Sequence, residues 1–309
     1  HQSGGGTGFS FSHLRPKGDI VKSTGGVASG PVSFMKVFDA ATEQIKQGGR
    51  RRGANMGALD VEHPDIERFI KVKKEEEALR NFNTSVATTG EFWDAYRSGE
   101  KYGLVNPRTG GVEEQEDPER ILELMAESAW ESGDPGVLFL DRINEDNPFP
   151  VEGPGDEHWI GSTNPCGEVP LEPYEPCILG SVNLGHHTRQ GEVDWEKLED
   201  TVRTGIRLLD NAVEMSVFPL DAIREKAEAN RKIGLGVMGF HDMLVDLEIP
   251  YHSEEAVEFA SELMEFISEK AFEASKGLAE ERGAFPNWEE SVYEEEVRNA
   301  TRTTIAPTG

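Results

Sequence analysis

Asn164, Cys166 and Glu168 form the pattern Asn-x-Cys-x-Glu and are the residues of this chain best suited to chemistry. Alternate residues of an extended loop project to the same side, so an amide, a thiol and a carboxylate can face one ligand. The thiol could donate a hydrogen atom or act as a nucleophile, the carboxylate could act as a general base, and the amide could hold a hydroxyl. Taken alone, so short a pattern is more often a proline turn with an inward-packed cysteine.

The only other cysteine, Cys177, is separated from Glu168 by eight residues and opens the segment Cys177-Ile178-Leu179-Gly180-Ser181-Val182-Asn183-Leu184. The two cysteines lack the C-x-x-C spacing of zinc sites, and no histidine lies at ligand spacing beside them, so we expect no metal site. Two cysteines in 309 residues also argue against a secreted disulfide scaffold.

The charge balance limits the possible partners. The chain has 58 acidic and 31 basic residues, a formal net charge of -27 and a pI near 4.7. Such a surface repels nucleic acids and anionic membranes, so we expect neither as a partner. The acidic residues are spread along the chain, which favours adaptation to high salt over an ordinary acidic enzyme. No apolar run reaches the roughly 20 residues that span a bilayer. We find no signal peptide, and we expect a cytoplasmic protein.

The elements that must position these residues alternate between helix and strand. Phe34, Val37, Phe38, Ala41 and Ile45 share one face of an expected helix that ends at Gly48-Gly49. Further helices are expected from about residue 64, burying Ile66, Phe69 and Ile70, and over residues 91–97, 118–131, 194–217 and 253–281. Strands are expected over residues 81–88, 137–140 and 303–306. This alternation, without repeats or a clear linker, predicts one α/β domain, in which residues 144–176 form a long surface excursion leading into the Cys166 loop.

Two short motifs invite other interpretations. Gly234 to Gly239 fits the dinucleotide fingerprint G-x-G-x-x-G. It follows a charged helical stretch rather than a clear buried strand, and we find no βαβ unit around it, so we interpret the glycines as close packing and reject NAD. Asp156-Glu157-His158-Trp159-Ile160-Gly161 fits the D-x-H-x-x-G pattern by which some cobalamin enzymes ligate cobalt. It lies in an acidic, proline-rich loop, and we interpret it as a coincidence.

The strings N-P-C-G-E-x-P-L and C-x-L-G-S-V-N-L together resemble the active-site loop of ribonucleotide reductase large subunits. The likeness is nearest the adenosylcobalamin-dependent class, class II. The family typically has Asn after the second cysteine, where this chain has Ile178. The Gly-rich start, the basic turn from Gln47 to Gly57, the segment from Arg231 to Phe240 and the final Thr304-Ile305-Ala306-Pro307-Thr308-Gly309 also match the family in style.

The resemblance implies a ten-stranded α/β barrel made of two five-stranded halves, of which residues 1–309 would be a single partial catalytic domain. The reaction implied is reduction of ribonucleotides to 2′-deoxyribonucleotides by a ribonucleoside-diphosphate reductase, with the choice between di- and triphosphate substrates left open. Adenosylcobalamin would generate a thiyl radical on Cys166, which takes the 3′ hydrogen of the ribose. Glu168 would accept the 3′-hydroxyl proton, and Asn164 would orient that hydroxyl. Cys177, with a second thiol, would supply reducing equivalents.

The resemblance also implies binding residues and partners. Glycine-rich backbone can present N–H groups to phosphate. The expected substrate-binding residues are Ser3, Gly4, Gly5, Gly6, Pro307, Thr308 and Gly309. The expected residues for dNTP and ATP effectors are Arg15, Lys17, Asp19, Lys22, Arg50, Arg51, Arg52 and Asn55. A thioredoxin-like reductant and a second copy of the chain, in a homodimer, complete the expected partners.

In the family the partner of Cys177 lies just upstream of the Gly-rich start. The chain begins at His1 and ends at Gly309, so we expect a fragment cut at both ends that is inactive alone. Two alternatives remain open. One is the large subunit of a di-iron, class I reductase, which receives its radical from a second subunit. The other is a non-catalytic module that retains the dNTP-binding loops without chemistry.

Overall fold

The computed structural model describes residues 5–22, 25–45, 53–75 and 78–308. The chain divides into two compact units, each described by itself. Unit 1 comprises His1–Asn147 and Gly153–Glu172, and unit 2 comprises Pro148–Glu152 and Pro173–Gly309. Cys166 therefore belongs to unit 1 and Cys177 to unit 2.

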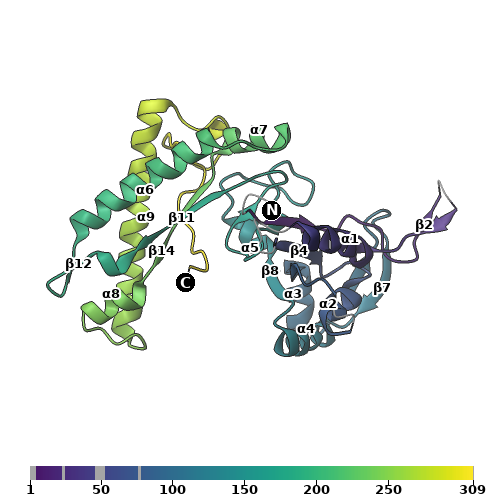
Figure 1. The fold of residues 1–309 in the computed structure, drawn as a ribbon. Coiled ribbons are helices and arrows are strands. Elements are labelled where there is room, and N and C mark those ends of the chain that lie inside the picture. The colour runs from purple at the N-terminus through teal and green to yellow at the C-terminus, as the bar shows by residue number, and fades with distance from the viewer. Residues whose placement is uncertain (1–4, 23–24, 46–52, 76–77, 309) are drawn as a thin grey trace. The chain divides into compact units, whose positions relative to one another are not determined.

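Unit 1 is built on a parallel sheet of four strands (Figure 1). Its order is β1 (Thr7–Ser10), β4 (Asn55–Asp60), β5 (Phe82–Thr88) and β8 (Gly136–Phe139), and every neighbouring pair is parallel. Strands β4 and β5 are the two central strands, and almost every residue in them is buried. Burial on both faces is typical of the middle of a parallel α/β sheet.

Five helices of unit 1 accompany this sheet: α1 (Pro31–Gln44), α2 (Ile66–Glu75), α3 (Gly90–Ser98), α4 (Pro118–Ser132) and α5 (Leu140–Glu145). Helix α4 shows the expected boundaries, because the side chain of Asp117 accepts the N–H of Glu119, Pro118 occupies the first turn, and Gly133 ends the helix in the left-handed conformation. Unit 1 also contains the antiparallel hairpin of β2 (Ile20–Val21) with β3 (Gly26–Val27) and that of β6 (Tyr102–Val105) with β7 (Val112–Glu116).

A helix is confirmed at α1, but it ends at Gln44, and its buried face was predicted wrongly; the predicted end at Gly48-Gly49 lies outside the described residues. Its buried residues are Pro31, Val32, Met35 and Thr42. The expected core residues, Phe34, Val37, Phe38, Ala41 and Ile45, are all exposed. Helix α2 does bury Ile66, Phe69 and Ile70 as predicted. The predicted helices at 91–97 and 118–131 and the strands at 81–88 and 137–140 are confirmed to within two residues at each boundary.

Unit 2 contains two parallel strands, β11 (Ile178–Asn183) and β14 (Ile233–Met238), connected through helix α6 (Trp195–Met215). Helix α6 covers one face of this pair with Val202, Ile206 and Leu209, and the long helix α9 (Glu254–Arg282) packs against α6 (Figure 1). Both long helices were predicted. Four shorter elements also belong to unit 2: helices α7 (Asp221–Asn230) and α8 (Phe240–Asp246) and the paired strands β12 (Thr188–Arg189) and β13 (Glu192–Val193).

The strands of unit 2 correct the interpretation of the segment around Gly234. The glycines lie within a largely buried strand, β14, and β11, α6 and β14 do form a βαβ unit. In the dinucleotide fingerprint the glycines follow the first strand of such a unit, whereas here Gly234 and Gly236 lie in its second strand. The interpretation as close packing is confirmed: a Cβ on Gly234 would lie 2.6 Å from Cγ2 of Thr304.

The described residues contain no closed barrel and no strand over residues 303–306. Thr303 makes only a single parallel bridge to Leu235, and Leu235 hydrogen-bonds both neighbouring residues, with its N–H on the carbonyl of Arg302 at 2.8 Å and its carbonyl on the N–H of Thr304 at 3.3 Å. The strand prediction at 303–306 was therefore wrong in extent. An α/β composition is confirmed.

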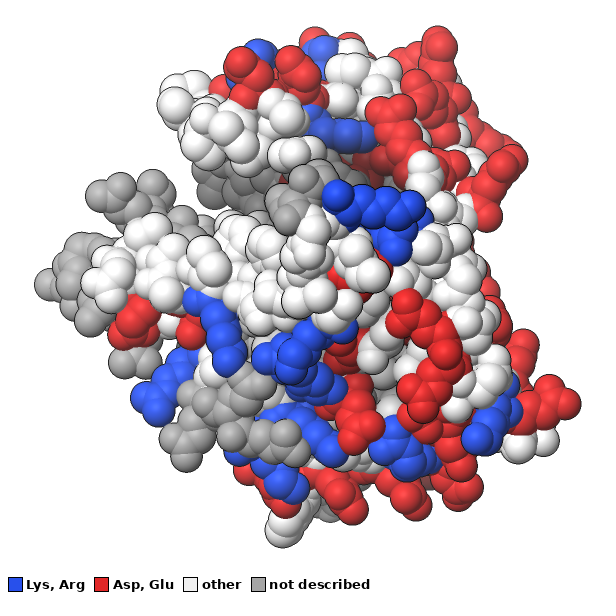
Figure 2. Space-filling model, turned by 90° about the vertical axis from the view of Figure 1, so that its right-hand side faces the viewer, with Lys and Arg blue, Asp and Glu red and all other residues white. Residues whose placement is uncertain are grey.

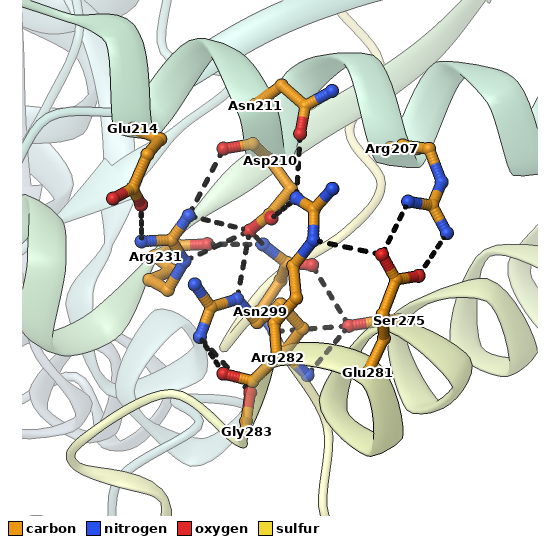
Figure 3. A network of polar contacts seen from close by, with 11 residues as sticks. Arg207, Asp210, Asn211, Glu214, Arg231, Ser275, Glu281, Arg282, Gly283 and Asn299 are labelled. Atoms are coloured by element: carbon orange, nitrogen blue, oxygen red, sulfur yellow. Dashed lines mark hydrogen bonds and ion pairs between the residues drawn. The ribbon is translucent and has the colours of Figure 1, made fainter.

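A buried polar network centred on Asp210 joins α6 and α9 to the segment after α9 (Figure 3). Asp210 is fully buried and forms ion pairs with Arg231 at 2.9 Å and Arg282 at 3.1 Å. The same carboxylate accepts a hydrogen bond of 3.2 Å from the side-chain amide of Asn299. Because a buried carboxylate is stable only when it is paired, this network fixes the position of Asn299 relative to both helices.

The surface reflects the composition of the chain. On the face shown in Figure 2, acidic side chains are spread widely, and lysine and arginine side chains lie among them. Among the helices of the described residues, none is long and apolar enough to cross a membrane.

Candidate functional site

Cys166 lies at the tip of a hairpin in unit 1. Strands β9 (Ser162–Thr163) and β10 (Pro170–Leu171) are antiparallel and hold the loop between them. The N–H of Asn164 donates to the carbonyl of Val169 at 3.2 Å, and the N–H of Gly167 donates to the carbonyl of Asn164 at 3.1 Å. Gly167 has a φ of +90°, a conformation that favours glycine, so the residue after the thiol is suited to this turn.

The hairpin exposes the thiol and holds its two polar neighbours more tightly. Cys166 is exposed, whereas Asn164 and Glu168 are half-buried. The side-chain oxygen of Asn164 accepts the N–H of Val169 at 3.0 Å. That bond occupies the oxygen and leaves the amide hydrogens of Asn164 as the donors for a ligand. The loop therefore offers a thiol, an amide donor and a carboxylate within five consecutive residues.

The surroundings of Cys166 raise the pKa of its thiol. Desolvation of the thiol and, to a smaller extent, the negative charge of Glu168 raise the pKa of Cys166. A nucleophilic cysteine usually has a lowered pKa, because the thiolate is the reactive form. A raised pKa does not provide that activation of Cys166 as a nucleophile.

The hairpin is anchored to the sheet of unit 1. The side-chain amide of Asn83, on β5, donates to the carbonyl of Pro165 at 2.7 Å. Strand β1 lies against β9 at a distance that only glycine permits, because a Cβ on Gly8 would overlap the carbonyl oxygen of Thr163. A Cβ on Gly6 would likewise collide with the ring of Pro165. Close approach of β1 to the Cys166 hairpin thus explains two glycines of the Gly-rich start.

The expected substrate-binding residues divide between the two units. In unit 1, Gly5 and Gly6 precede β1, and Gly6 lies against Pro165 of the hairpin, while Ser3 and Gly4 lie outside the described residues. In unit 2, Pro307 and Thr308 are described and Gly309 is not. The hydroxyl of Thr308 forms a hydrogen bond of 2.8 Å with the hydroxyl of Ser181 on β11.

Cys177 directly precedes β11 and is half-buried. Ser181 lies within β11, four residues after Cys177, and both residues belong to unit 2. Cys166 and its two neighbours lie in unit 1.

Three of the expected effector residues, Arg15, Lys17 and Lys22, lie in or close to the β2–β3 hairpin of unit 1 along the chain. Arg15 donates from Nη1 to the carbonyl of Ile20 at 3.2 Å, and the backbone N–H of Lys17 donates to the carboxylate of Asp65 at 2.9 Å. These contacts use the backbone of Lys17 and one nitrogen of Arg15. Lys22 is exposed. Arg50, Arg51 and Arg52 lie outside the described residues.

Two other expected effector residues are engaged by the protein itself. Asp19 forms a bidentate pair with Arg108, at 2.8 and 2.9 Å, and this hydrogen-bonded guanidinium lowers the pKa of Asp19 to about 2. Asn55 is buried at the start of β4, where its oxygen accepts the hydroxyl of Thr7 at 2.6 Å and its amide donates to Thr42 at 3.0 Å. In this arrangement Asn55 ties β1 and α1 to β4.

His158 occupies a structural position. It is buried, its Nδ1 lies 3.1 Å from the buried carboxylate of Glu172, and its carbonyl accepts the side-chain amide of Asn147 at 2.8 Å. These contacts hold His158 in the fold of unit 1, and the interpretation of the D-x-H-x-x-G pattern as a coincidence stays a prediction.

Three residues of these sites were not recognised in the sequence: Gly8, Asn83 and Ser181. An asparagine in a strand and a serine in a strand carry no signal of their own, because their partners lie 82 and 127 residues away. Gly8 is different, since a glycine that interrupts an alternating strand is a recognised sign of close backbone approach.

Comparison with known proteins places these residues in a family. Residues 1–308 match the family described as ribonucleotide reductase, barrel domain. The chain is 53% identical over its whole length to a vitamin B12-dependent ribonucleoside-diphosphate reductase of Thermoplasma acidophilum, and covers 40% of that protein. It is 49% identical to a protein of the same name from Mycobacterium tuberculosis, covering 44% of it.

A more distant relative is the alpha subunit of a ribonucleoside-diphosphate reductase from Chlamydia pneumoniae, 31% identical over 94% of this chain and 31% of the relative. The chain thus spans less than half the length of these relatives. Since the family match extends over nearly every residue, the chain belongs to the ribonucleotide reductase barrel domain family.

Proposed function

We propose that the complete protein reduces ribonucleoside diphosphates to 2′-deoxyribonucleoside diphosphates through a thiyl radical on Cys166. The observation that carries the proposal is the hairpin that exposes the thiol of Cys166 and places it, along the chain, between the amide of Asn164 and the carboxylate of Glu168. The names of the two relatives at 53% and 49% identity support the diphosphate as substrate.

Three residues of the hairpin, Asn164, Cys166 and Glu168, act in the proposed mechanism. The sulfur radical on Cys166 takes the 3′ hydrogen of the ribose. Glu168 accepts the proton of the 3′ hydroxyl, which makes it the general base. Asn164 donates a hydrogen bond from its side-chain amide to the same hydroxyl, because its oxygen is already bonded to Val169. The hydrogen on C3′ returns from Cys166 at the end of the cycle.

Cys177 is the proposed source of reducing equivalents. Loss of water from C2′ needs two electrons, which a pair of thiols supplies by forming a disulfide. Cys166 and Cys177 are the only cysteines of this chain, so the second thiol of the pair comes from another part of the protein. A thioredoxin-like protein would then reduce the disulfide.

Adenosylcobalamin is the proposed cofactor. The relatives at 53% and 49% identity are named as vitamin B12-dependent, whereas the alpha subunit is 31% identical. The exposed S–H of Cys166 fits a cofactor that acts from outside the loop. When bound, adenosylcobalamin would supply the radical that removes the hydrogen atom from Cys166. We assign no cobalt ligand within this chain.

We further infer that residues 1–309 belong to one barrel domain of ten strands in the complete protein. The parallel order β1-β4-β5-β8 and the parallel pair β11–β14 support this inference, since both are the kind of sheet from which such a barrel is built. The Gly-rich stretch Ser3–Gly6 and the turn Pro307–Gly309 would bind the substrate. Arg15, Lys17, Asp19, Lys22, Arg50, Arg51, Arg52 and Asn55 would form or support the site for dNTP and ATP effectors.

The proposed partner copy of the chain would cover α1. Its exposed face carries Phe34 and Val37, and Ile20 and Val27 of the β2–β3 hairpin are also exposed. Large apolar side chains exposed along a helix usually mark an interface. The excess of acid supports a salt-adapted protein that binds neither nucleic acid nor anionic membrane, and we propose a cytoplasmic location.

The proposal is tested with the complete protein and a ribonucleoside diphosphate. Reduction should require adenosylcobalamin, and electron paramagnetic resonance should show a cob(II)alamin–thiyl signal that is lost when Cys166 is replaced by Ser. Reduction that instead requires a di-iron partner subunit would show a class I enzyme. Binding of dNTPs without any product under either condition would show a non-catalytic module.

A further inference from the structure

The segment that follows Arg302 crosses the two-stranded sheet of unit 2. It starts beside β14, where Thr303 bridges Leu235. It then turns over the face of the sheet, because a Cβ on Gly236 would lie against the carbonyl oxygen of Thr304, at 2.5 Å, and near the backbone nitrogen of Ala306. The two glycines of β14 thus make room for residues 304–306.

The face that this segment crosses is the one opposite α6. A Cβ on Gly180 would meet Leu209 of α6 and Leu235, so Gly180 points toward the helix. A Cβ on Gly234 would meet Leu179 and Thr304, so these residues share the other face. Because side chains alternate along a strand, Ser181 faces the same way as Leu179, and it is the register partner of Gly236.

The far end of the segment is held on β11 by Ser181. The hydroxyls of Ser181 and Thr308 lie 2.8 Å apart. Thr308 also closes a tight turn around Pro307, since its N–H donates to the carbonyl of Ala306 at 2.8 Å and its hydroxyl lies 3.3 Å from the same oxygen. The hydroxyl of Ser181 therefore connects this turn to the sheet.

The near end of the segment is fixed independently. Asn299 is fully buried, its amide donates to Asp210 and to the carbonyl of Arg231 at 3.1 Å, and its oxygen accepts the hydroxyl of Ser275 at 3.0 Å (Figure 3). Loss of the Ser181 hydroxyl should consequently leave the path of residues 299–304 unchanged and affect the turn at Pro307 and Thr308.

We propose that Ser181 is a positioning residue for the nucleotide phosphates, acting through Thr308. This inference rests on the proposed function, in which Pro307 and Thr308 bind the substrate. Cys177 lies four residues before Ser181, a span of about 13 Å in extended chain. Strand β11 would then set the separation between the thiol that reduces C2′ and the turn that holds the phosphates.

The experiment compares Ser181→Ala, Ser181→Thr and the control Ser261→Ala in the complete protein. Ser261 is exposed on α9, away from the sheet face described above. Ser181→Ala should raise both KM and the equilibrium Kd for the ribonucleoside diphosphate about 3- to 10-fold, the loss of one hydrogen bond, with kcat within about twofold. Ser181→Thr should restore both values, and Ser261→Ala should not change them.

A second pair of variants separates this inference from the proposed function. Thr308→Ala should raise KM and Kd, and adding Ser181→Ala to it should have no further effect, because the two hydroxyls act as one unit. If Thr308→Ala weakens binding but Ser181→Ala does not, the role of Ser181 is refuted while the phosphate site stands. If Ser181→Ala lowers kcat alone, the positioning role is also refuted. If Thr308→Ala leaves Kd unchanged, the turn is not a phosphate site.

Discussion

The side-chain oxygen of Asn164 accepts the backbone N–H of Val169 at 3.0 Å, so the amide that precedes Cys166 also closes the loop that carries it. The oxygen of the Asn164 side chain therefore stabilises the loop, and its NH₂ group is available to the substrate. Glu168 lies between these two bonded residues in sequence, and the loop bond thus restrains the carboxylate as well as the amide.

Replacing Asn164 by Asp distinguishes the role of the oxygen in the loop from the role of the NH₂ group in binding substrate. Asp retains an oxygen that can accept the N–H of Val169, but it has no amide donor, so the loop should keep its stability while kcat falls about 100-fold or more, the usual cost of one lost donor to a reacting oxygen. Asn164→Ala should lose both the donor and the loop bond, and its thermal midpoint should also fall. Wild-type kcat in Asn164→Asp would refute the orienting role of the amide.

Glu168→Gln should lower the pKa of Cys166. The negative charge of Glu168 is one of the two causes that raise this pKa, so its removal increases the thiolate fraction at a given pH. Alkylation by iodoacetamide, measured from pH 7 to pH 10 in a Cys177→Ser background, should be faster in the variant below the pKa. Glu145→Gln, at an exposed glutamate of unit 1, is the control. An unchanged pH profile in Glu168→Gln would mean that the two groups do not interact.

The sequence predicted the long helices but not the pairing of strands, and the roles of Asn164, Cys166 and Glu168 stay predictions. Strands β11 and β14 were not recognised because Gly180, Gly234 and Gly236 lower the strand propensity of both segments. The structure forms them nonetheless, since α6 covers one face and residues 304–306 lie against the glycines on the other. Such contacts between residues far apart in the chain are invisible to local patterns.

For helix α1, the local sequence likewise did not reveal which residues are buried. Phe34, Val37 and Phe38 repeat with helical spacing, but so do Val32 and Met35 on the neighbouring face. Periodicity identifies the helix and cannot decide which of two apolar faces meets the sheet.

That exposed face of α1 leads to a prediction about assembly. Val37→Glu places a charge where the proposed homodimer buries apolar surface, so the variant should be monomeric in analytical ultracentrifugation at micromolar concentration. Val257→Glu on α9 is a matched control, because Val37 and Val257 are both 67% exposed. A dimer that persists in Val37→Glu and dissociates in Val257→Glu would place the interface elsewhere.

Glu62, just after β4, should make stability depend on pH. Burial raises its pKa from 4.5 to about 7, partly offset by the hydroxyl of Thr89, which donates to its carboxylate. Because the pKa of Glu62 is higher in the folded protein than in the unfolded chain, Glu62 stabilises the fold most below pH 4.5. This contribution to the free energy of unfolding is lost as pH rises through 7. Relative to the wild type, Glu62→Gln should therefore gain about 2 to 3 kcal/mol in the free energy of unfolding between pH 5 and pH 8.

Glu62→Gln keeps an oxygen to accept the hydroxyl of Thr89, so the comparison isolates the charge. Denaturant unfolding of both proteins at pH 5, 6, 7 and 8 provides the measurement. Parallel stability curves for the two proteins would show that Glu62 titrates in the folded protein as it does in the unfolded chain.

The central claim is that Cys166 carries the radical, and Cys166→Ser in the complete protein tests it most directly. A serine hydroxyl keeps the size of the side chain but does not yield its hydrogen atom as a thiol does, so deoxyribonucleotide formation with adenosylcobalamin and a thiol reductant should fall below detection. Equilibrium binding of dNTP effectors should be unchanged, which shows that the variant is folded. Deoxyribonucleotide formation by Cys166→Ser at a rate comparable to the wild type would contradict the account.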